Sequence, residues 1–189
     1  MSIYLTRHGQ TDWNKANLIQ GRIDVPLNET GIAQAKELAL KLKDVHLDRI
    51  IASPLQRTMD TATAINEYHH LEIETDARLL EQYYGTLEGT PRTGELYHHK
   101  RGSIASRYPS GEGYFDVVHR IYSLLDELKA TASDQDILLV AHGGISRVIR
   151  SYFLPQENDE FVHYGMENCS VIKYEFVERD FPLRVEINP

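Results

Sequence analysis

The stretch SIYLTRHGQT, residues 2–11, decides how the fold is interpreted, because an apolar run stops abruptly at Arg7-His8-Gly9. Ser2–Thr6 has the composition of a buried β-strand. A guanidinium beside an imidazole is costly to bury without partners, and a glycine after the pair allows the backbone to turn sharply. The first strand therefore ends at two side chains that need a polar partner.

A second strand-like run ends in a similar way. Asp136–Ala141 is almost wholly apolar, as in a strand covered on both faces of an α/β sheet, and His142-Gly143-Gly144 follows it directly. A third run, Arg49–Ala52, leads into a helix that carries Arg57 in its first turn. Ligands of open α/β sheets bind outside the carboxyl ends of the strands. We therefore expect two histidines and two arginines to meet at one edge of the sheet.

Helices alternate with these strands. Ser53-Pro54 predicts a helix start, with Ser53 as the N-cap and Pro54 in the first turn, and the helix should continue to Tyr68. Residues 145–154 are predicted to form another helix. Two further helices are predicted from apolar residues at helical spacing, at Ile32, Ala35, Leu38, Ala39 and Leu42, and at Phe115, Val118, Ile121, Leu125 and Leu128.

The remaining segments are less regular. Leu71–Thr75 is a weaker strand candidate, and residues 169–178 and 182–187 are expected to form a strand pair at a sheet edge. Residues 78–113 carry little periodicity, and residues 83–113 of this segment are predicted to form a lid-like insertion over the site. The pattern predicts an α/β fold, a three-layer αβα sandwich with a mostly parallel sheet, in a single domain of residues 1–189.

Composition limits the classes of protein. The chain has 189 residues, of which 41% are hydrophobic and 25% charged, as in a soluble globular protein. No apolar run approaches the roughly 18 residues of a membrane span, and no secretory signal is recognisable, so we expect a cytoplasmic protein without a membrane partner. The net charge of -8 argues against a nucleic-acid partner, although a few convergent cations can still attract an anionic ligand.

The sequence offers little for a metal or a disulfide. Cys169 is the only cysteine, and we expect it to be a small buried residue. The doublets His69-His70 and His98-His99 are interpreted as solvated surface, because adjacent side chains rarely point at one ion. We therefore expect neither a metal nor a cofactor.

The residues at the predicted sheet edge suit a phosphate ester. Arg7 and Arg57 could clamp phosphoryl oxygens in fork geometry, and a neutral imidazole can attack phosphorus. A general acid must also protonate the leaving alkoxide. Glu81 is the best candidate, although Glu88 and Asp76 lie close to it in the sequence.

Five segments, in order, resemble the histidine phosphatase superfamily, whose fold is the phosphoglycerate mutase-like fold. They are TRHGQTDWN, QGRIDVPLNETG, ASPLQRTMDTA, LLEQYYGTLEG and VAHGG, and the resemblance spans about residues 3–150. The resemblance implies that His8 is the nucleophile and that Glu81 is the proton donor and then the base that activates water. It also implies a phosphate pocket of Arg7, Arg57 and His142, with further contacts from Asn14, Gln20, Gly21 and Gly143.

Gln10 departs from the glutamate often found after the RHG triplet, which removes a negative charge near the pocket without affecting a catalytic role. The short interval between Glu81 and His142 favours the small phosphatase branch. The expected function is a metal-independent phosphomonoester phosphatase that acts on a small phosphorylated metabolite through a phosphohistidine. A cofactor-dependent phosphoglycerate mutase and a non-catalytic binding protein are the alternatives.

Two properties stay open at the level of sequence. The basic cluster at residues 98–107 is either a solvated loop or a site for a second anionic group of the substrate. The C-terminal strands are either an exposed edge or the interface of a homodimer. The natural substrate is equally undetermined, since its specificity depends on the aperiodic segment.

Overall fold

The structure is a computed structural model that describes residues 1–132 and 134–176. Its strands are β1 (Ser2–Arg7), β2 (Arg49–Ala52), β3 (Ile73–Thr75), β4 (Asp136–Ala141) and β5 (Val171–Glu175). Its α-helices are α1 (Asp12–Lys15), α2 (Glu29–Leu42), α3 (Gln56–Asn66), α4 (Glu95–Gly102), α5 (Tyr114–Thr131), α6 (Gly143–Phe153) and α7 (Asn158–His163). Two short 3₁₀ turns, η1 (Ala77–Leu79) and η2 (Gly85–Leu87), precede α4.

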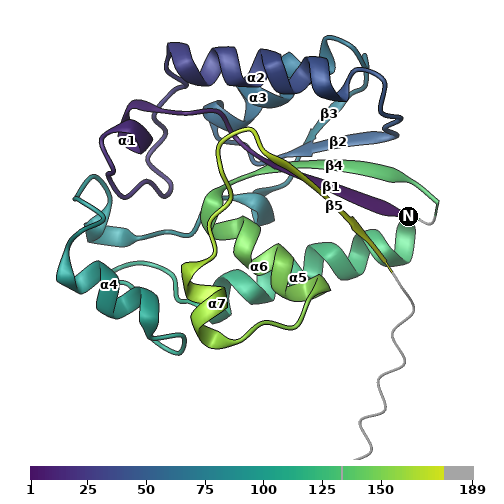
Figure 1. Cartoon of the computed structure of the whole chain (residues 1–189). Helices are drawn as coiled ribbons and strands as arrows, with labels where there is room; N and C mark the ends of the chain where they lie inside the picture. Colours follow the sequence, from purple (N-terminus) through teal and green to yellow (C-terminus); the bar gives the residue numbers. More distant parts are fainter. Residues whose placement is uncertain (133, 177–189) are drawn as a thin grey trace, which may run out of the picture.

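The strands form one sheet in the order β3-β2-β4-β1-β5. Strands β1 to β4 pair in parallel, and β5 pairs antiparallel with β1 at the edge. Helices α2 and α3 cover one face of the sheet, and α5 and α6 cover the other (Figure 1). The prediction of a three-layer αβα sandwich with a mostly parallel sheet is confirmed.

Alternating side chains of the central strands form two cores. Leu138 and Val140 of β4 pack with the buried face of α2 and α3, whereas Ile137 and Leu139 pack with α5 and α6. The near-continuous apolar sequence of β4 follows from burial on both faces. This packing holds the carboxyl ends of β1, β2 and β4 in register, because β1 and β2 both pair with β4.

The predicted bounds of β2 and β4 are confirmed, and α2 and α5 occur where their spacing predicted them. The predicted burial is wrong for two residues of these apolar faces. Ile32 is 47% exposed and Phe115 is 64% exposed. Both lie in the first turn of their helix, away from the buried stripe, and Gly31 and Tyr114 occupy the buried positions next to them.

The start of α3 also differs from the prediction. The helix begins at Gln56, after Leu55 as the N-cap residue, and no side chain caps it. Ser53 lies two residues earlier, where its backbone N–H donates to the carbonyl of Val140. Its hydroxyl is therefore free for a partner other than a helix terminus.

Residues 83–113, predicted to be aperiodic, contain α4. Of this helix only Tyr97 is buried, so no apolar face marked it in the sequence. The first C-terminal strand, predicted at residues 169–178, begins at Val171 and runs to Glu175. Residues 177 and 178, and the second predicted strand at residues 182–187, lie outside the described residues. Among the described residues, no helix combines the length and apolarity needed to cross a membrane.

Candidate active site

The two predicted histidines lie side by side at the carboxyl edge of the sheet. His8 follows β1 and its backbone N–H donates to the carbonyl of Ala141, the last residue of β4. His142 follows Ala141 directly. The two imidazole rings meet edge to face with their centroids 5.2 Å apart, and both side chains are buried. The parallel pairing of β1 with β4 thus brings together residues that are far apart in the sequence.

The imidazole of His8 is oriented by its own backbone. Its Nδ1 lies 2.7 Å from the carbonyl oxygen of Gly9. A carbonyl only accepts, so Nδ1 carries the proton and Nε2 keeps a lone pair. Burial, followed by the positive charges of Arg57 and Arg7, holds the pKa of His8 well below its ordinary value of 6.5. The ring is therefore neutral at physiological pH, with a free nitrogen.

Arg7 contributes a guanidinium whose positive charge acts on this imidazole. One of its terminal nitrogens donates to the carbonyl of Met166 at 2.7 Å, which anchors the side chain to the segment before β5. Burial, followed by the charge of Arg92, lowers the pKa of Arg7 to about 10, so the group remains a cation at neutral pH. Its buried Nε has no partner among the described residues.

Arg57 is fully buried and holds a loop rather than lining open space. Its Nη2 donates to the carbonyl of Gly21 at 2.6 Å and its Nη1 to the carbonyl of Ile23 at 3.1 Å, with Oδ1 of Asp24 at 3.4 Å. Burial lowers the pKa of Arg57, and the charge of Glu81 opposes that effect. Arg57 thus adds positive potential behind His8.

Glu81 is buried and held by two backbone donors. Its Oε2 accepts from the N–H of Gly144 at 2.9 Å, and its Oε1 accepts from the N–H of Gln82 at 2.8 Å. A Cβ on Gly144 would lie 2.5 Å from Oε1, so a glycine is needed for this approach. The contact ties the carboxylate to the first turn of α6, next to His142.

The other acidic candidates are engaged elsewhere. Glu88 accepts from the backbone N–H groups of Arg22 at 2.9 Å and Ile23 at 2.8 Å. Asp76 is paired with Arg78 at 2.6 Å. Among the three carboxylates weighed from the sequence, Glu81 is therefore the one that lines the cavity beside His8.

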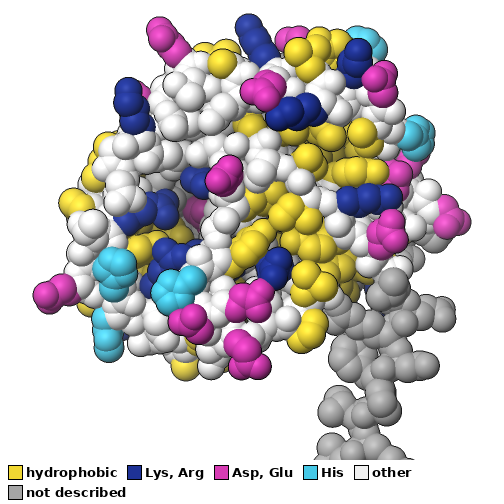
Figure 2. Space-filling view, in the orientation of Figure 1, with side chains coloured by type: hydrophobic (Ala, Val, Ile, Leu, Met, Phe, Trp, Pro, Cys, Tyr) yellow, Lys and Arg dark blue, Asp and Glu magenta, His cyan; other side chains and the backbone are white. Residues whose placement is uncertain are grey.

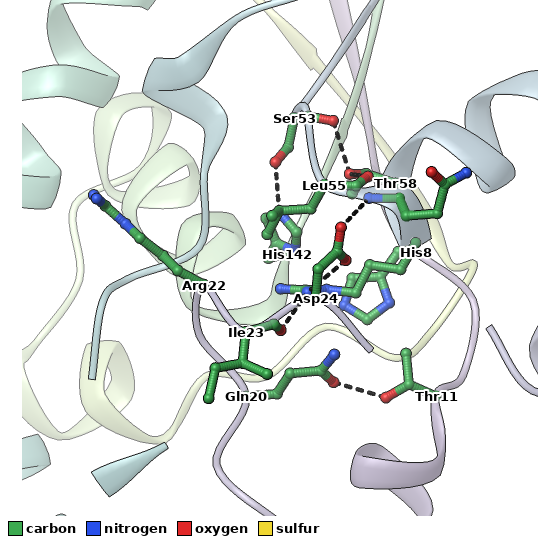
Figure 3. A network of polar contacts seen from close by, with 12 residues as sticks. His8, Thr11, Gln20, Arg22, Ile23, Asp24, Ser53, Leu55, Thr58 and His142 are labelled. Atoms are coloured by element: carbon green, nitrogen blue, oxygen red, sulfur yellow. Dashed lines mark hydrogen bonds and ion pairs between the residues drawn. The ribbon is translucent and has the colours of Figure 1, made fainter. Parts of the chain in front are cut away.

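A short polar network extends the site. The amide oxygen of Gln20 accepts from the Thr11 hydroxyl at 2.7 Å and from Nδ2 of Asn14 at 3.2 Å (Figure 3 shows the first of these). Thr11 and Asn14 also cap α1 reciprocally. Asn14 and Gln20 are therefore fixed in place before any ligand binds.

These groups surround a cavity of about 160 Å³. Six of the predicted site residues line it: Arg7, His8, Asn14, Gln20, Glu81 and Gly143. Three others, Arg57, His142 and Gly21, are not among its lining residues. Figure 2 shows Lys and Arg side chains gathered in the hollow between α1 and α4.

Three further arginines that line the cavity were not named individually as site residues from the sequence. Arg92 comes from the segment between η2 and α4, Arg101 from α4 and Arg147 from α6. Arg101 belongs to the basic cluster at residues 98–107, which was the one available signal. Arg147 donates to the Tyr114 hydroxyl at 2.9 Å, a contact between helices that no local pattern reveals.

The described residues contain no group of three or more His, Cys, Asp or Glu side chains that could hold a metal ion. Cys169 is half-buried, and burial raises the pKa of its thiol to about 12, which makes it a poor nucleophile.

The fold is that of phosphoglycerate mutase-like phosphatases. A sequence model of the histidine phosphatase superfamily (branch 1) matches residues 3–188, and the chain belongs to that superfamily. It is a phosphatase of this superfamily, with phosphoglycerate mutase-like proteins among its relatives.

Some of the similar proteins are named as phosphatases and others as phosphoglycerate mutases. A Bacillus subtilis (strain 168) protein described as an uncharacterized phosphatase, PhoE, is 37% identical over 97% of this chain and 92% of its own length. A Yersinia pestis (strain Pestoides F) probable phosphoglycerate mutase, GpmB, is 33% identical over 94% of this chain and 86% of its own. The solved mycobacterial glucosyl-3-phosphoglycerate phosphatase Rv2419c, in complex with VO3, has a TM-score of 0.82 at 30% identity, covering 91% of both chains.

Proposed function

We propose that the protein is a metal-independent phosphomonoester phosphatase that acts on a small phosphorylated metabolite through a phosphohistidine at His8. The observation that carries the proposal is the state of this imidazole. Its Nδ1 is bound to the carbonyl of Gly9, its pKa is lowered by burial, and its Nε2 faces a cavity that Arg7 and Glu81 also line.

In the first step, Nε2 of His8 attacks phosphorus and an N–P bond forms while the P–O bond to the alcohol breaks. Glu81, protonated at this stage, gives its proton to the leaving oxygen. In the second step, the Glu81 carboxylate takes a proton from water as that water attacks phosphorus. The N–P bond breaks, inorganic phosphate leaves, and both side chains return to their starting states.

Positive charge stabilises the phosphoryl group during both steps. Arg7 supplies a guanidinium at the cavity wall, and Arg57 adds potential from behind it. The N-terminus of α6, an 11-residue helix, begins at Gly143 beside His142 and adds its dipole. Positioning and charge neutralisation account for most of the catalysis of phosphoryl transfer.

We further propose that the substrate carries a second anionic group. Arg92, Arg101 and Arg147 line the same cavity as His8 and exceed what one phosphoryl group requires. The similarity to a glucosyl-3-phosphoglycerate phosphatase agrees with an acidic substrate. Replacing Arg92 or Arg101 with alanine should raise KM for phosphorylated acids and leave KM for p-nitrophenyl phosphate nearly unchanged. An equal rise for both substrates would contradict the second anionic group.

A phosphoglycerate mutase is the alternative, favoured by the similarity to GpmB. The two functions separate in one assay with EDTA present, using p-nitrophenyl phosphate, then 3-phosphoglycerate with 2,3-bisphosphoglycerate. Release of inorganic phosphate supports the phosphatase. Interconversion of phosphoglycerates without release supports the mutase, and neither reaction would indicate a binding protein.

A further inference from the structure

Ser53 and His142 form a buried pair beneath the candidate site. The Ser53 hydroxyl lies 2.8 Å from Nε2 of His142, and both side chains have no exposed surface (Figure 3). The two residues follow β2 and β4, which pair in parallel, so the contact is fixed by the sheet. Ser53 does not cap α3, and among the described residues its hydroxyl makes no hydrogen bond other than the one to His142.

The second nitrogen of His142 is the one left for a ligand. Its Nδ1 is buried and has no partner among the described residues. The ring packs edge to face against His8, where the phosphoryl group would be attached. A buried nitrogen without a partner is costly, so the position is best explained by a ligand that completes it.

The position of one proton decides what this nitrogen can do. Burial holds the pKa of His142 well below 6.5, and electrostatic interactions with Arg57 and then His8 lower it further. The ring is therefore neutral and carries a single proton. With the proton on Nδ1, the ring donates to an anionic oxygen. With the proton on Nε2, a lone pair faces that oxygen and repels it.

We propose that Ser53 is a positioning residue, whose hydroxyl donates to Nε2 of His142 and thereby keeps the imidazole proton on Nδ1, toward the phosphoryl group on His8. This inference rests on the proposed function of His8. Ser53 itself touches neither the substrate nor the reacting atoms, and it acts only through the tautomer of His142.

The most direct test reads the tautomer by ¹⁵N NMR of the histidine side chains in the free protein at pH 7.5. The expected spectrum for His142 has a protonated Nδ1 and an unprotonated, hydrogen-bonded Nε2. A protonated Nε2 in the wild type would overturn the inference. The measurement needs no substrate, so it fails or succeeds independently of the phosphatase activity.

Variants then connect the tautomer with turnover. Ser53→Ala should move the His142 proton toward Nε2 or give a mixture, and kcat should fall about 10- to 100-fold, the range for groups that orient a site histidine, with KM within about twofold. Ser53→Thr keeps a hydroxyl and should recover most of kcat. Ser151→Ala is the matched control, because it removes a hydroxyl that donates to the Val148 carbonyl. It should change neither the tautomer of His142 nor kcat.

An unchanged tautomer in Ser53→Ala would overturn the inference even if activity fell, because the loss would then be structural. If Ser53→Ala does not fold, the wild-type spectrum and Ser53→Thr still decide the question. Loss of phosphate turnover in the wild type, with the expected tautomer present, would contradict the proposed function instead.

Discussion

The imidazole of His8 combines a free nitrogen with a neutral ring, and both properties come from its place after β1. The strand delivers it to a buried edge, the following glycine supplies the carbonyl that binds Nδ1, and two arginines disfavour the imidazolium. At the scale of the residue, the chemistry depends on which proton each buried group holds.

The pKa of His8 gives the first prediction. Burial and the charge of Arg57 lower this pKa, so His8 should remain neutral as the pH falls through 6.5. Arg57→Gln removes a neighbouring positive charge. The imidazolium of His8 then meets less repulsion, and the pKa of His8 should rise toward 6.5. NMR titration of the His8 resonances measures this pKa in the wild type and in the variant. Arg150→Gln, at a surface ion pair with Glu160, is the control and should leave it unchanged. A pKa that stays constant or falls in Arg57→Gln would contradict the electrostatic account.

Gly144 gives the second prediction. A methyl group there would lie 2.5 Å from Oε1 of Glu81 and 3.1 Å from the Tyr84 hydroxyl. Gly144→Ala should therefore displace the carboxylate and lower kcat about 100-fold, the effect of misplacing a group by about 1 Å. Gly102→Ala is the matched control, because its Cβ meets nothing within 4 Å of the described chain. Wild-type kcat in Gly144→Ala would show that the position of Glu81 is not critical.

Residues at strand ends were predictable, whereas the walls of the site were not. His8 and His142 follow apolar runs, and parallel strands bring their carboxyl ends to one edge. The contact between Ser53 and His142 joins residues 89 positions apart, and Ser53 before a proline resembled a helix cap. Arg147 looked like an ordinary helix residue, because only the packing of α5 and α6 shows that it lines the cavity.

At the scale of elements, the loop between α1 and α2 is held from two sides. The carboxylate of Glu88 binds the N–H groups of Arg22 and Ile23, and the guanidinium of Arg57 binds the carbonyls of Gly21 and Ile23. Gly21 is required here, since a Cβ would lie 2.2 Å from Oε1 of Glu88. The loop therefore positions Arg57 as much as Arg57 positions the loop.

Glu88 gives the third prediction. In Glu88→Gln one backbone N–H group faces an amide NH₂ instead of a carboxylate oxygen, so the loop should shift. The free energy of unfolding should fall by about 1–3 kcal/mol, the cost of losing hydrogen bonds to a charged group, and kcat should fall with it. Urea unfolding and steady-state kinetics measure both. Glu37→Gln, in an exposed pair with Lys41, should change neither. Unaltered kinetics in Glu88→Gln would separate this loop from catalysis.

Elements with a continuous apolar period were predictable, and short elements were not. Helix α4 buries only Tyr97 and α7 has six residues, so neither presents an amphipathic stripe long enough to detect. The errors at Ile32 and Phe115 have one cause, because the first turn of a helix can lie beyond the core that the later turns cover.

At the scale of the whole molecule, the fold buries two neutral histidines at the edge of its sheet. Burial lowers the pKa of both His8 and His142 below the value of about 6.5 in the unfolded chain. Below that value the unfolded chain binds more protons than the folded one. The stability of the fold is therefore linked to the same groups that would carry the chemistry.

This linkage gives the fourth prediction. The free energy of unfolding should be highest above pH 6.5 and fall as the pH drops below it, by up to about 1.4 kcal/mol per pH unit for each histidine. His142→Gln should flatten this dependence relative to the wild type. Urea unfolding at a series of pH values measures it, with the exposed His163→Gln as the control. A wild-type slope of zero between pH 6.5 and 5 would contradict the burial of neutral imidazoles.

The phosphoenzyme intermediate tests the central claim most directly. The protein is mixed with a ³²P-labelled phosphomonoester in EDTA, quenched within milliseconds and digested, and the labelled peptide is identified. The account predicts label on His8 alone, stable to alkali and lost in acid, and absent from His8→Ala. Label on another residue, or steady release of phosphate by His8→Ala at the wild-type rate, would contradict it.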